Sequence, residues 1–67
     1  MRGLLAVQFT GIIRNWTLEP YTNTVWGTDA YGKPFHTARV KELNRSAGYA
    51  TTWSGHFYKL EEEKVDA

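Results

Sequence analysis

Residues 4–18 read LLAVQFTGIIRNWTL, and this stretch decides the fold class. Leu5, Val7 and Phe9 alternate with small or polar residues, which is the period-two pattern of a strand with one buried face. Beyond Gly11 the apolar residues fall on the other parity, so we expect a bulge or sharp bend at this glycine. The segment therefore predicts a β-strand that turns a corner.

The remainder of the chain is expected to form short strands separated by turns. Thr, aromatic and β-branched residues are abundant, and long runs of helix-forming residues are scarce. Strands are predicted at residues 24–28, 35–43 and 49–60, with turns at 19–23, 29–34 and 44–48. We expect the strand at 35–43 to return antiparallel to the one that holds Trp26. The pattern predicts an all-β fold, either a small antiparallel sheet or a partly open barrel, with about four to five strands.

Residues 38–47 are also compatible with a short helix. Their apolar side chains fall near helical spacing, Thr37 is a suitable N-cap, and Gly48 is a suitable residue to follow a helix end. Phe35 and His36, directly before them, are strand-like and favour a strand instead. A strand is our preferred prediction, and the helix is the alternative.

The charge distribution separates a basic body from an acidic tail. Residues 1–60 hold seven basic and three acidic side chains, a net charge of +4, whereas residues 61–67 carry −3. We therefore expect a single β-domain at 1–60 and an acidic tail at 61–67, either disordered or forming a short helical turn. The body tolerates an anionic partner but lacks the dense Lys/Arg stripe expected of a dedicated duplex-DNA binder.

The chain is short, with 67 residues and no cysteine. Small domains bury only about 60% of the surface of the unfolded chain, so they often need disulfides, metals or self-association. Because disulfides and thiolate zinc sites are excluded and only two histidines are present, we predict a homo-oligomer without metal or cofactor. Gln8 and Thr10 interrupt the N-terminal apolar run, and Arg14 follows where the cleavage site of a signal peptide would be, so we predict a cytoplasmic protein with no membrane partner.

Aromatic residues are more numerous than one small core requires. The chain has three Trp, four Tyr and three Phe, and large residues fall on both faces of the expected strands. The simplest interpretation places Phe9, Trp16, Trp26, Trp53 and Phe57 in the core. Other aromatic residues then lie at an interface or form a stacking platform. Tyr31, beside Gly32 in a loop, is the aromatic residue least easily explained by a core.

Polar residues that suit anion recognition gather on the third and last expected strands. They are His36, Thr37, Arg39, Thr52, Ser54 and His56, with Trp26 and Tyr31 as aromatic candidates for the same ligand site. An arginine binds phosphate through two parallel hydrogen bonds, hydroxyls donate single ones, and aromatic rings stack on bases. The alternative is ordinary sheet decoration, because threonine is a good strand residue and Arg39 can simply be solvated.

Ser54 and His56 lie two residues apart, within hydrogen-bond reach on one face of a strand. Such a pair is the beginning of a nucleophilic site. No motif ties an acidic residue to His56, and the chain has no nucleophile elbow, Walker loop or paired-carboxylate spacing. We therefore predict that the protein is not an enzyme.

Three segments together resemble small bacteriophage-encoded β-proteins. They are GIIRNW at 11–16, HTARV at 36–40 and TWSGHFYKL at 52–60. Ala38 departs from the family pattern, which often has Ser there, and this weakens a hydroxyl-based site at that position. The resemblance implies a phage accessory protein in the cytoplasm of a bacterial host and no particular activity.

These observations lead to one hypothesis and two alternatives. The leading hypothesis is a non-enzymatic phage protein that counters host defence by sequestering a nucleotide-like or other anionic small ligand. The first alternative is an inhibitor that docks on a host protein through exposed aromatic residues. The second is a module that binds single-stranded nucleic acid. No sequence feature separates the three.

Overall fold

The computed structural model describes residues 9–65, which contain six strands and no helix. They are β1 (Gly11–Glu19), β2 (Thr24–Thr28), β3 (Pro34–His36), β4 (Val40–Asn44), β5 (Tyr49–Thr52) and β6 (Phe57–Glu63). The all-β prediction is confirmed, but four to five strands were too few. The alternative helix at 38–47 is wrong, because these residues form β4 and the turn that follows it.

Two of the predicted strands are each divided in the structure. The one expected at 35–43 is split into β3 and β4 by residues 37–39, and the one expected at 49–60 is split into β5 and β6 by a turn. Gly55 reverses the chain in that turn, with a φ of 92° that other residues rarely adopt. The expected helical turn or disorder of the tail is wrong for residues 61–63, which belong to β6. Residues 4–8 of the first expected strand and 66–67 of the tail lie outside the described residues.

The strands form one mixed sheet in the order β3-β2-β1-β6-β5-β4. Neighbours are antiparallel except at the centre, where β1 and β6 run parallel. The prediction of an antiparallel sheet is therefore wrong for this one pair. A parallel pair needs a long connection between its strands, and here the connection contains the other four strands.

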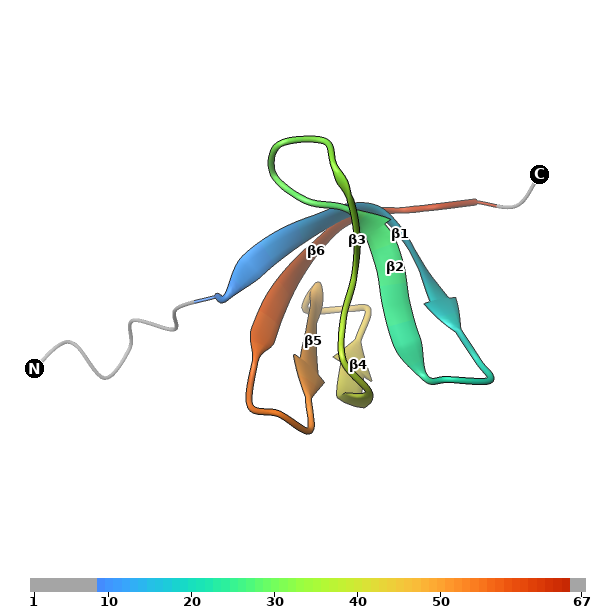
Figure 1. The fold of residues 1–67 in the computed structure, drawn as a ribbon, viewed down its shortest axis with the longest axis vertical. Coiled ribbons are helices and arrows are strands. Elements are labelled where there is room, and N and C mark those ends of the chain that lie inside the picture. The colour runs from blue at the N-terminus through green and yellow to red at the C-terminus, as the bar shows by residue number, and fades with distance from the viewer. Residues whose placement is uncertain (1–8, 66–67) are drawn as a thin grey trace, which may run out of the picture.

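The sheet curls because its two edge strands, β3 and β4, are consecutive in the chain (Figure 1). Residues 37–39 carry the chain from one edge to the other. Val40, at the start of β4, donates its N–H to the carbonyl of Asn23 at 2.7 Å, and the Asn23 side-chain amide donates to the Val40 carbonyl at 2.8 Å. These two bonds link β4 to the β1–β2 turn, although the sheet does not close into a barrel.

The two central strands bend at the same level. Asn15 in β1 and Glu62 in β6 both have positive φ, 53° and 58°. They lie side by side, because the register pairs Arg14 with Glu61 and Trp16 with Glu63. The pairing of β1 with β2 also shifts between Arg14 and Thr17. The bend expected at Gly11 therefore lies further along, since Gly11 begins β1.

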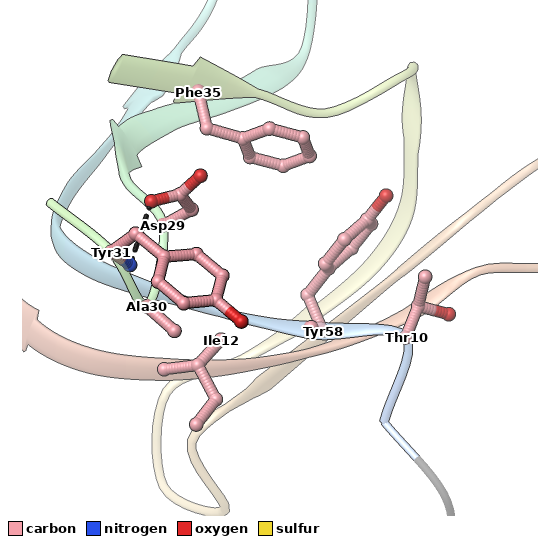
Figure 2. A pocket seen from close by; sticks show the side chains of 8 residues that line it. Thr10, Ile12, Asp29, Ala30, Tyr31, Phe35 and Tyr58 are labelled. Atoms are coloured by element: carbon pink, nitrogen blue, oxygen red, sulfur yellow. Dashed lines mark hydrogen bonds between the residues drawn. The ribbon is translucent and has the colours of Figure 1, made fainter. Parts of the chain in front are cut away.

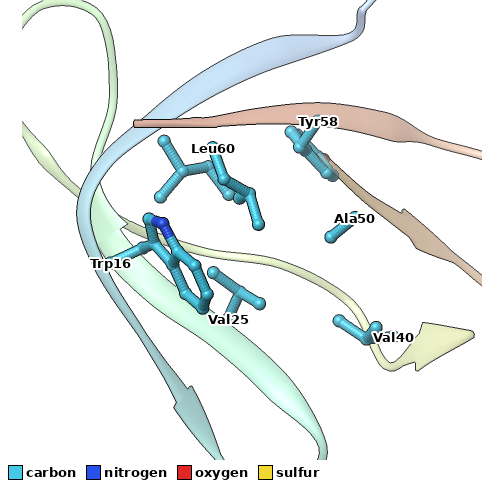
Figure 3. Packing of buried hydrophobic residues seen from close by; sticks show 7 residues of the cluster. Trp16, Val25, Val40, Ala50, Tyr58 and Leu60 are labelled. Atoms are coloured by element: carbon cyan, nitrogen blue, oxygen red, sulfur yellow. The ribbon is translucent and has the colours of Figure 1, made fainter. Parts of the chain in front are cut away.

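The core lies inside the curl, as Figure 3 shows. It consists of Ile13, Trp16, Val25, Val40, Ala50, Tyr58 and Leu60. Of the aromatic residues expected there, Trp16 is buried and Phe57 is half-buried. For Phe9, Trp26 and Trp53 the prediction is wrong, because their side chains are 41%, 46% and 66% exposed. Within residues 9–65, the structure contains no helix of the length and hydropathy that a membrane span requires.

Candidate functional site

The residues predicted to bind a ligand fall into separate regions of the structure. Thr37 is in the interior, Trp26 and His36 lie on an exposed face, and Tyr31 lies at the tip of the β2–β3 loop. Arg39, Thr52, Ser54 and His56 lie around the turn between β5 and β6. The structure therefore brings half of the predicted set together and separates the rest.

The side chain at the centre of this group is Trp53, the first residue after β5. Its backbone N–H donates to the Arg39 carbonyl at 3.0 Å, which ties the turn to the crossing segment 37–39. The Lys41 Nζ lies 5.1 Å from the centroid of the exposed indole ring. An open hollow of about 500 Å³ is lined by Asn23, Arg39, Val40, Lys41 and Trp53. We call this hollow the Trp53 site.

The Trp53 site is positively charged. Arg39 and Lys41 are both exposed, and the described residues that line the hollow include no acidic side chain. A neighbouring hollow of about 430 Å³ shares Lys41 and contains Thr52 and His56. Glu42 lines this neighbour and accepts a hydrogen bond from the Tyr49 hydroxyl at 3.1 Å. The cationic part of the surface is therefore the side that carries the indole.

A hydrogen-bonded chain of side chains fixes the β5–β6 turn. The Thr52 and Ser54 hydroxyls are 2.8 Å apart, and Ser54 Oγ lies 2.9 Å from His56 Nδ1. The backbone N–H of His56 donates to the Thr52 hydroxyl at 3.2 Å. The predicted Ser54–His56 contact is confirmed, although it arises within a turn and not along a strand face. In the hydrogen bonds of residues 9–65, no carboxylate bonds His56 to complete a catalytic triad.

Thr37 is buried and bonds to backbone groups, so a ligand at the surface does not reach its hydroxyl. Its side chain is 2% exposed. The hydroxyl accepts the Val25 N–H at 3.0 Å and donates to the Ala38 carbonyl at 2.6 Å. Both of these bonds satisfy backbone groups at the point where the chain leaves β3, which buried polar groups require.

Trp26 and His36 form a second aromatic group on the outer face of β2 and β3. Their rings stack with centroids 4.3 Å apart and planes 19° apart, because the register places them directly opposite each other. The Trp26 indole N–H donates to the Thr24 hydroxyl at 2.8 Å. These two predicted residues therefore form a unit of their own, away from the Trp53 site.

Tyr31 lines a different hollow, which we call the loop pocket (Figure 2). This pocket has a volume of about 350 Å³ and is lined by Thr10, Gly11, Ile12, Asp29, Ala30, Tyr31, Phe35 and Tyr58. Most of these side chains are apolar or aromatic. Burial raises the pKa of the Tyr58 hydroxyl above its usual value of 10.0, so this phenol is neutral at physiological pH.

Several residues of these sites were missed by reasoning from the sequence. Trp53 was assigned to the core because residues 49–60 were interpreted as one strand. The adjacent Ser54 and Gly55 are a turn signal that places Trp53 at a surface corner. Lys41 was missed because it reaches Trp53 through the pairing of β4 with β5, and Asp29 because its loop was interpreted only as a turn. The contact of Phe35 with Tyr58 had no local signal, since β3 and β6 are not neighbours in the sheet.

Comparison of the chain with protein-family models, curated proteins and solved structures finds no match. The resemblance to bacteriophage proteins stays a prediction. Within residues 9–65, no group of three or more His, Asp or Glu side chains is arranged to hold a metal ion. The functional argument therefore rests on the geometry of the Trp53 site and its neighbours.

Proposed function

We propose that this protein is a non-enzymatic binding protein that captures a nucleotide-like anionic ligand at the Trp53 site. The observation that carries the proposal is the exposed Trp53 indole, which has Lys41 Nζ 5.1 Å from its centroid and shares its hollow with Arg39. A nucleotide has a flat base and a charged phosphate, and this pairing of groups matches both.

The energies of the two contacts favour stacking of a base on Trp53. A base stacked on an aromatic ring contributes about 1–3 kcal/mol. An exposed cation–π contact such as that of Lys41 with Trp53 contributes about 0.5–1 kcal/mol. A base can therefore displace Lys41 from the ring at small cost. The released ammonium group then binds the phosphate together with the Arg39 guanidinium, which offers two parallel donors.

The position of the indole is supported by the surrounding backbone. The Trp53 N–H bond to Arg39 and the Thr52–Ser54–His56 chain hold both ends of the turn. Less conformational freedom is then lost when a ligand binds, which favours affinity. His56 is exposed and lines the adjoining hollow, so we expect its ring to contact a sugar or a second phosphate. Thr52 is only 3% exposed, and its hydroxyl supports the turn through its bonds to Ser54 and to the His56 N–H.

Calorimetry with mono-, di- and cyclic nucleotides tests this proposal. We expect binding by the wild type, and a loss of affinity of about tenfold or more in Trp53→Ala and in Arg39→Gln. Lys33→Gln is the matched control, because it removes the same charge from a loop outside the Trp53 site. Absence of heat across the nucleotide panel, or equal affinities in wild type and Trp53→Ala, contradicts the proposal.

Single-stranded nucleic acid is the alternative ligand for the same surface. When several Lys and Arg side chains neutralise the phosphates of a nucleic acid, its affinity for the protein falls steeply as the salt concentration rises. Titrations with a mononucleotide and with an oligonucleotide at two salt concentrations separate the two ligands. A much tighter, strongly salt-dependent complex with the oligonucleotide favours the nucleic acid.

Inhibition of a host protein is a second candidate function, which the exposed Trp26–His36 stack favours. Aromatic residues are enriched where proteins dock on one another. This function predicts that Trp26→Ala abolishes capture of a host protein, while Trp53→Ala and added nucleotides leave it unchanged. A phage accessory role in a bacterial host is compatible with either candidate.

A further inference from the structure

The loop pocket gathers three aromatic side chains and one carboxylate from residues 29–35 and from β6. Tyr31 and Asp29 come from the β2–β3 loop, Phe35 from β3 and Tyr58 from β6. Figure 2 shows the three rings and the Asp29 carboxylate around the same hollow. At about 350 Å³, it lies at the small end of the roughly 300–1,000 Å³ range of ligand pockets.

The Asp29 carboxylate is held in a defined position. Its Oδ1 accepts the backbone N–H groups of Tyr31 and Lys33, each at 2.9 Å. The Asp29 N–H donates to the Lys33 carbonyl at 2.8 Å, and Gly32, at φ 80°, donates its N–H to the Asp29 carbonyl at 3.0 Å. The loop is thus built around this carboxylate, and its Oδ2 takes no part in these bonds. The bond from Lys33 holds the pKa of Asp29 below its usual 3.8, so the group is ionised at neutral pH.

The walls of the loop pocket are chemically suited to a methylated cation. The Phe35 and Tyr58 rings contact each other with centroids 5.5 Å apart and planes tilted by 54°. Tyr31 is largely exposed, and Ile12 adds an apolar surface. Ring faces attract cations through their negative quadrupole, and methyl groups pack well on them. The described residues lining the pocket include no lysine or arginine, so its one charge is the negative charge of Asp29.

We propose that the loop pocket binds a small organic cation that carries a trimethylammonium group, such as choline. The aromatic rings contact the methyl groups, and Asp29 balances the positive charge. The same carboxylate repels phosphates, so this site is separate in chemistry and in position from the Trp53 site. The inference therefore does not depend on the function proposed above.

Lys33 opposes this binding. Lys33 lies in the same loop as Asp29, and its backbone N–H donates to Asp29 Oδ1 at 2.9 Å. Both this bond and the Lys33 charge lower the pKa of the Asp29 carboxyl group. A lysine ammonium is compact and strongly hydrated, so it gains less from the aromatic walls than a trimethylammonium group does. Removing the Lys33 charge is therefore expected to strengthen ligand binding.

Nuclear magnetic resonance titration tests the proposal with choline, tetramethylammonium and 3,3-dimethylbutan-1-ol, the uncharged analogue of choline. We expect both cations to shift the ring resonances of Tyr31, Phe35 and Tyr58, and the alcohol to bind at least fivefold more weakly. Equal binding of the alcohol overturns the proposal, because it shows that charge plays no role. Absence of shifts in these rings at tens of millimolar cation also overturns it.

Variants assign the binding to individual groups. Asp29→Asn keeps the oxygen that accepts the two loop hydrogen bonds but removes the charge, so we expect about a tenfold loss of choline affinity. Tyr31→Ala is expected to weaken binding about threefold and Lys33→Gln to strengthen it about twofold. Tyr21→Ala, in the exposed β1–β2 turn, and Trp53→Ala are expected to leave it unchanged. Unchanged affinity in Asp29→Asn contradicts the proposal. If that variant does not fold, the comparison of choline with the alcohol still decides.

Discussion

Trp16 and Trp53 are two tryptophans that lie in regions of opposite burial. Each ring has a cation above it: Arg45 Cζ lies 5.5 Å from the Trp16 ring, and Lys41 Nζ lies 5.1 Å from the Trp53 ring. Trp16 is 4% exposed at the centre of the sheet, whereas Trp53 is exposed at a turn. Arg45 is also fixed by Glu63, with Nε 3.2 Å from both carboxylate oxygens. Among the ion pairs of residues 9–65, none includes Lys41.

The difference teaches how a cation above an indole is to be interpreted. At Trp16 an acidic residue holds the cation and the ring is buried, so the pair covers the core. At Trp53 the cation is exposed and no acid of the described residues is paired with it, so a ligand can replace it. Burial and the partner of the cation therefore separate the structural pair at Trp16 from the pair at Trp53, where we propose that a ligand binds.

The largest expected effect is on stability, when each indole is removed in turn. Trp16→Ala is expected to destabilise the fold by about 3–5 kcal/mol, because it leaves a large cavity in the core. Trp53→Ala is expected to change stability by about 0.5 kcal/mol or less, as for other exposed residues. Urea unfolding followed by circular dichroism measures both. Similar losses in the two variants contradict the distinction between the two regions.

A smaller effect is expected at Gly27, which lies against the backbone of the Trp16 region. A Cβ added there meets the Arg14 carbonyl oxygen at 2.6 Å and the Ile13 Cγ2 at 2.8 Å. Gly27→Ala is therefore expected to cost about 1–3 kcal/mol. Gly11→Ala is the matched control, since its Cβ meets the Tyr58 ring at an ordinary 3.7 Å. Equal midpoints of thermal unfolding in the two variants would be inconsistent with this close approach.

The buried Thr37 hydroxyl and the Ser54 hydroxyl in the β5–β6 turn extend the comparison of a buried with an exposed region to polar residues. Thr37→Val leaves the buried Val25 N–H without its acceptor and is expected to cost about 1–2 kcal/mol. Ser54→Ala interrupts the chain in the β5–β6 turn at its exposed part. Water can replace the bond at His56, and the buried Thr52 hydroxyl keeps its bond to the His56 N–H, so the expected cost is about 0.5 kcal/mol or less. Chemical unfolding measures both. A larger loss from Ser54→Ala reverses the assignment of structural and surface roles.

The smallest effect is a gain in stability at Glu62. This residue has a φ of 58°, a conformation that costs side chains other than Gly and Asn about 1–2 kcal/mol. Glu62→Asn is expected to raise the free energy of unfolding by about 0.5–1 kcal/mol. Glu62→Gln separates this effect from charge, because it removes the charge and keeps the unfavourable backbone. Equal gains from both variants indicate an electrostatic origin instead.

Local chemistry made part of the fold predictable. The strand at 24–28 and the turns around Asn23, Gly32 and Gly48 follow from residues that favour or tolerate those backbone conformations, and all of them are confirmed. The parallel pairing of β1 with β6 was not predictable, because it depends on how distant strands meet. The positive φ of Asn15 and that of Glu62 were not predictable either, because the two residues form one bend only when β1 and β6 pair.

The candidate site was also predicted only in part, because local sequence placed some of its residues and missed the turn that brings the others to the surface. Arg39, Thr52, Ser54 and His56 do gather, but around a turn that the period-two interpretation had missed. That missed turn also placed Trp53 in the core and left Lys41 unnoticed. Self-association stays a prediction.

The parallel seam between β1 and β6 has a consequence for the synthesis of the chain. Arg14 and Glu61, which join the two strands by an ion pair, are 47 residues apart in the sequence. On the ribosome, β1 and β2 emerge early, but an isolated two-stranded hairpin is marginally stable in water. The centre of the sheet can assemble only after β6 has left the exit tunnel. Contacts of such long range slow folding, so the growing chain exposes Ile13 and Trp16 until β6 arrives.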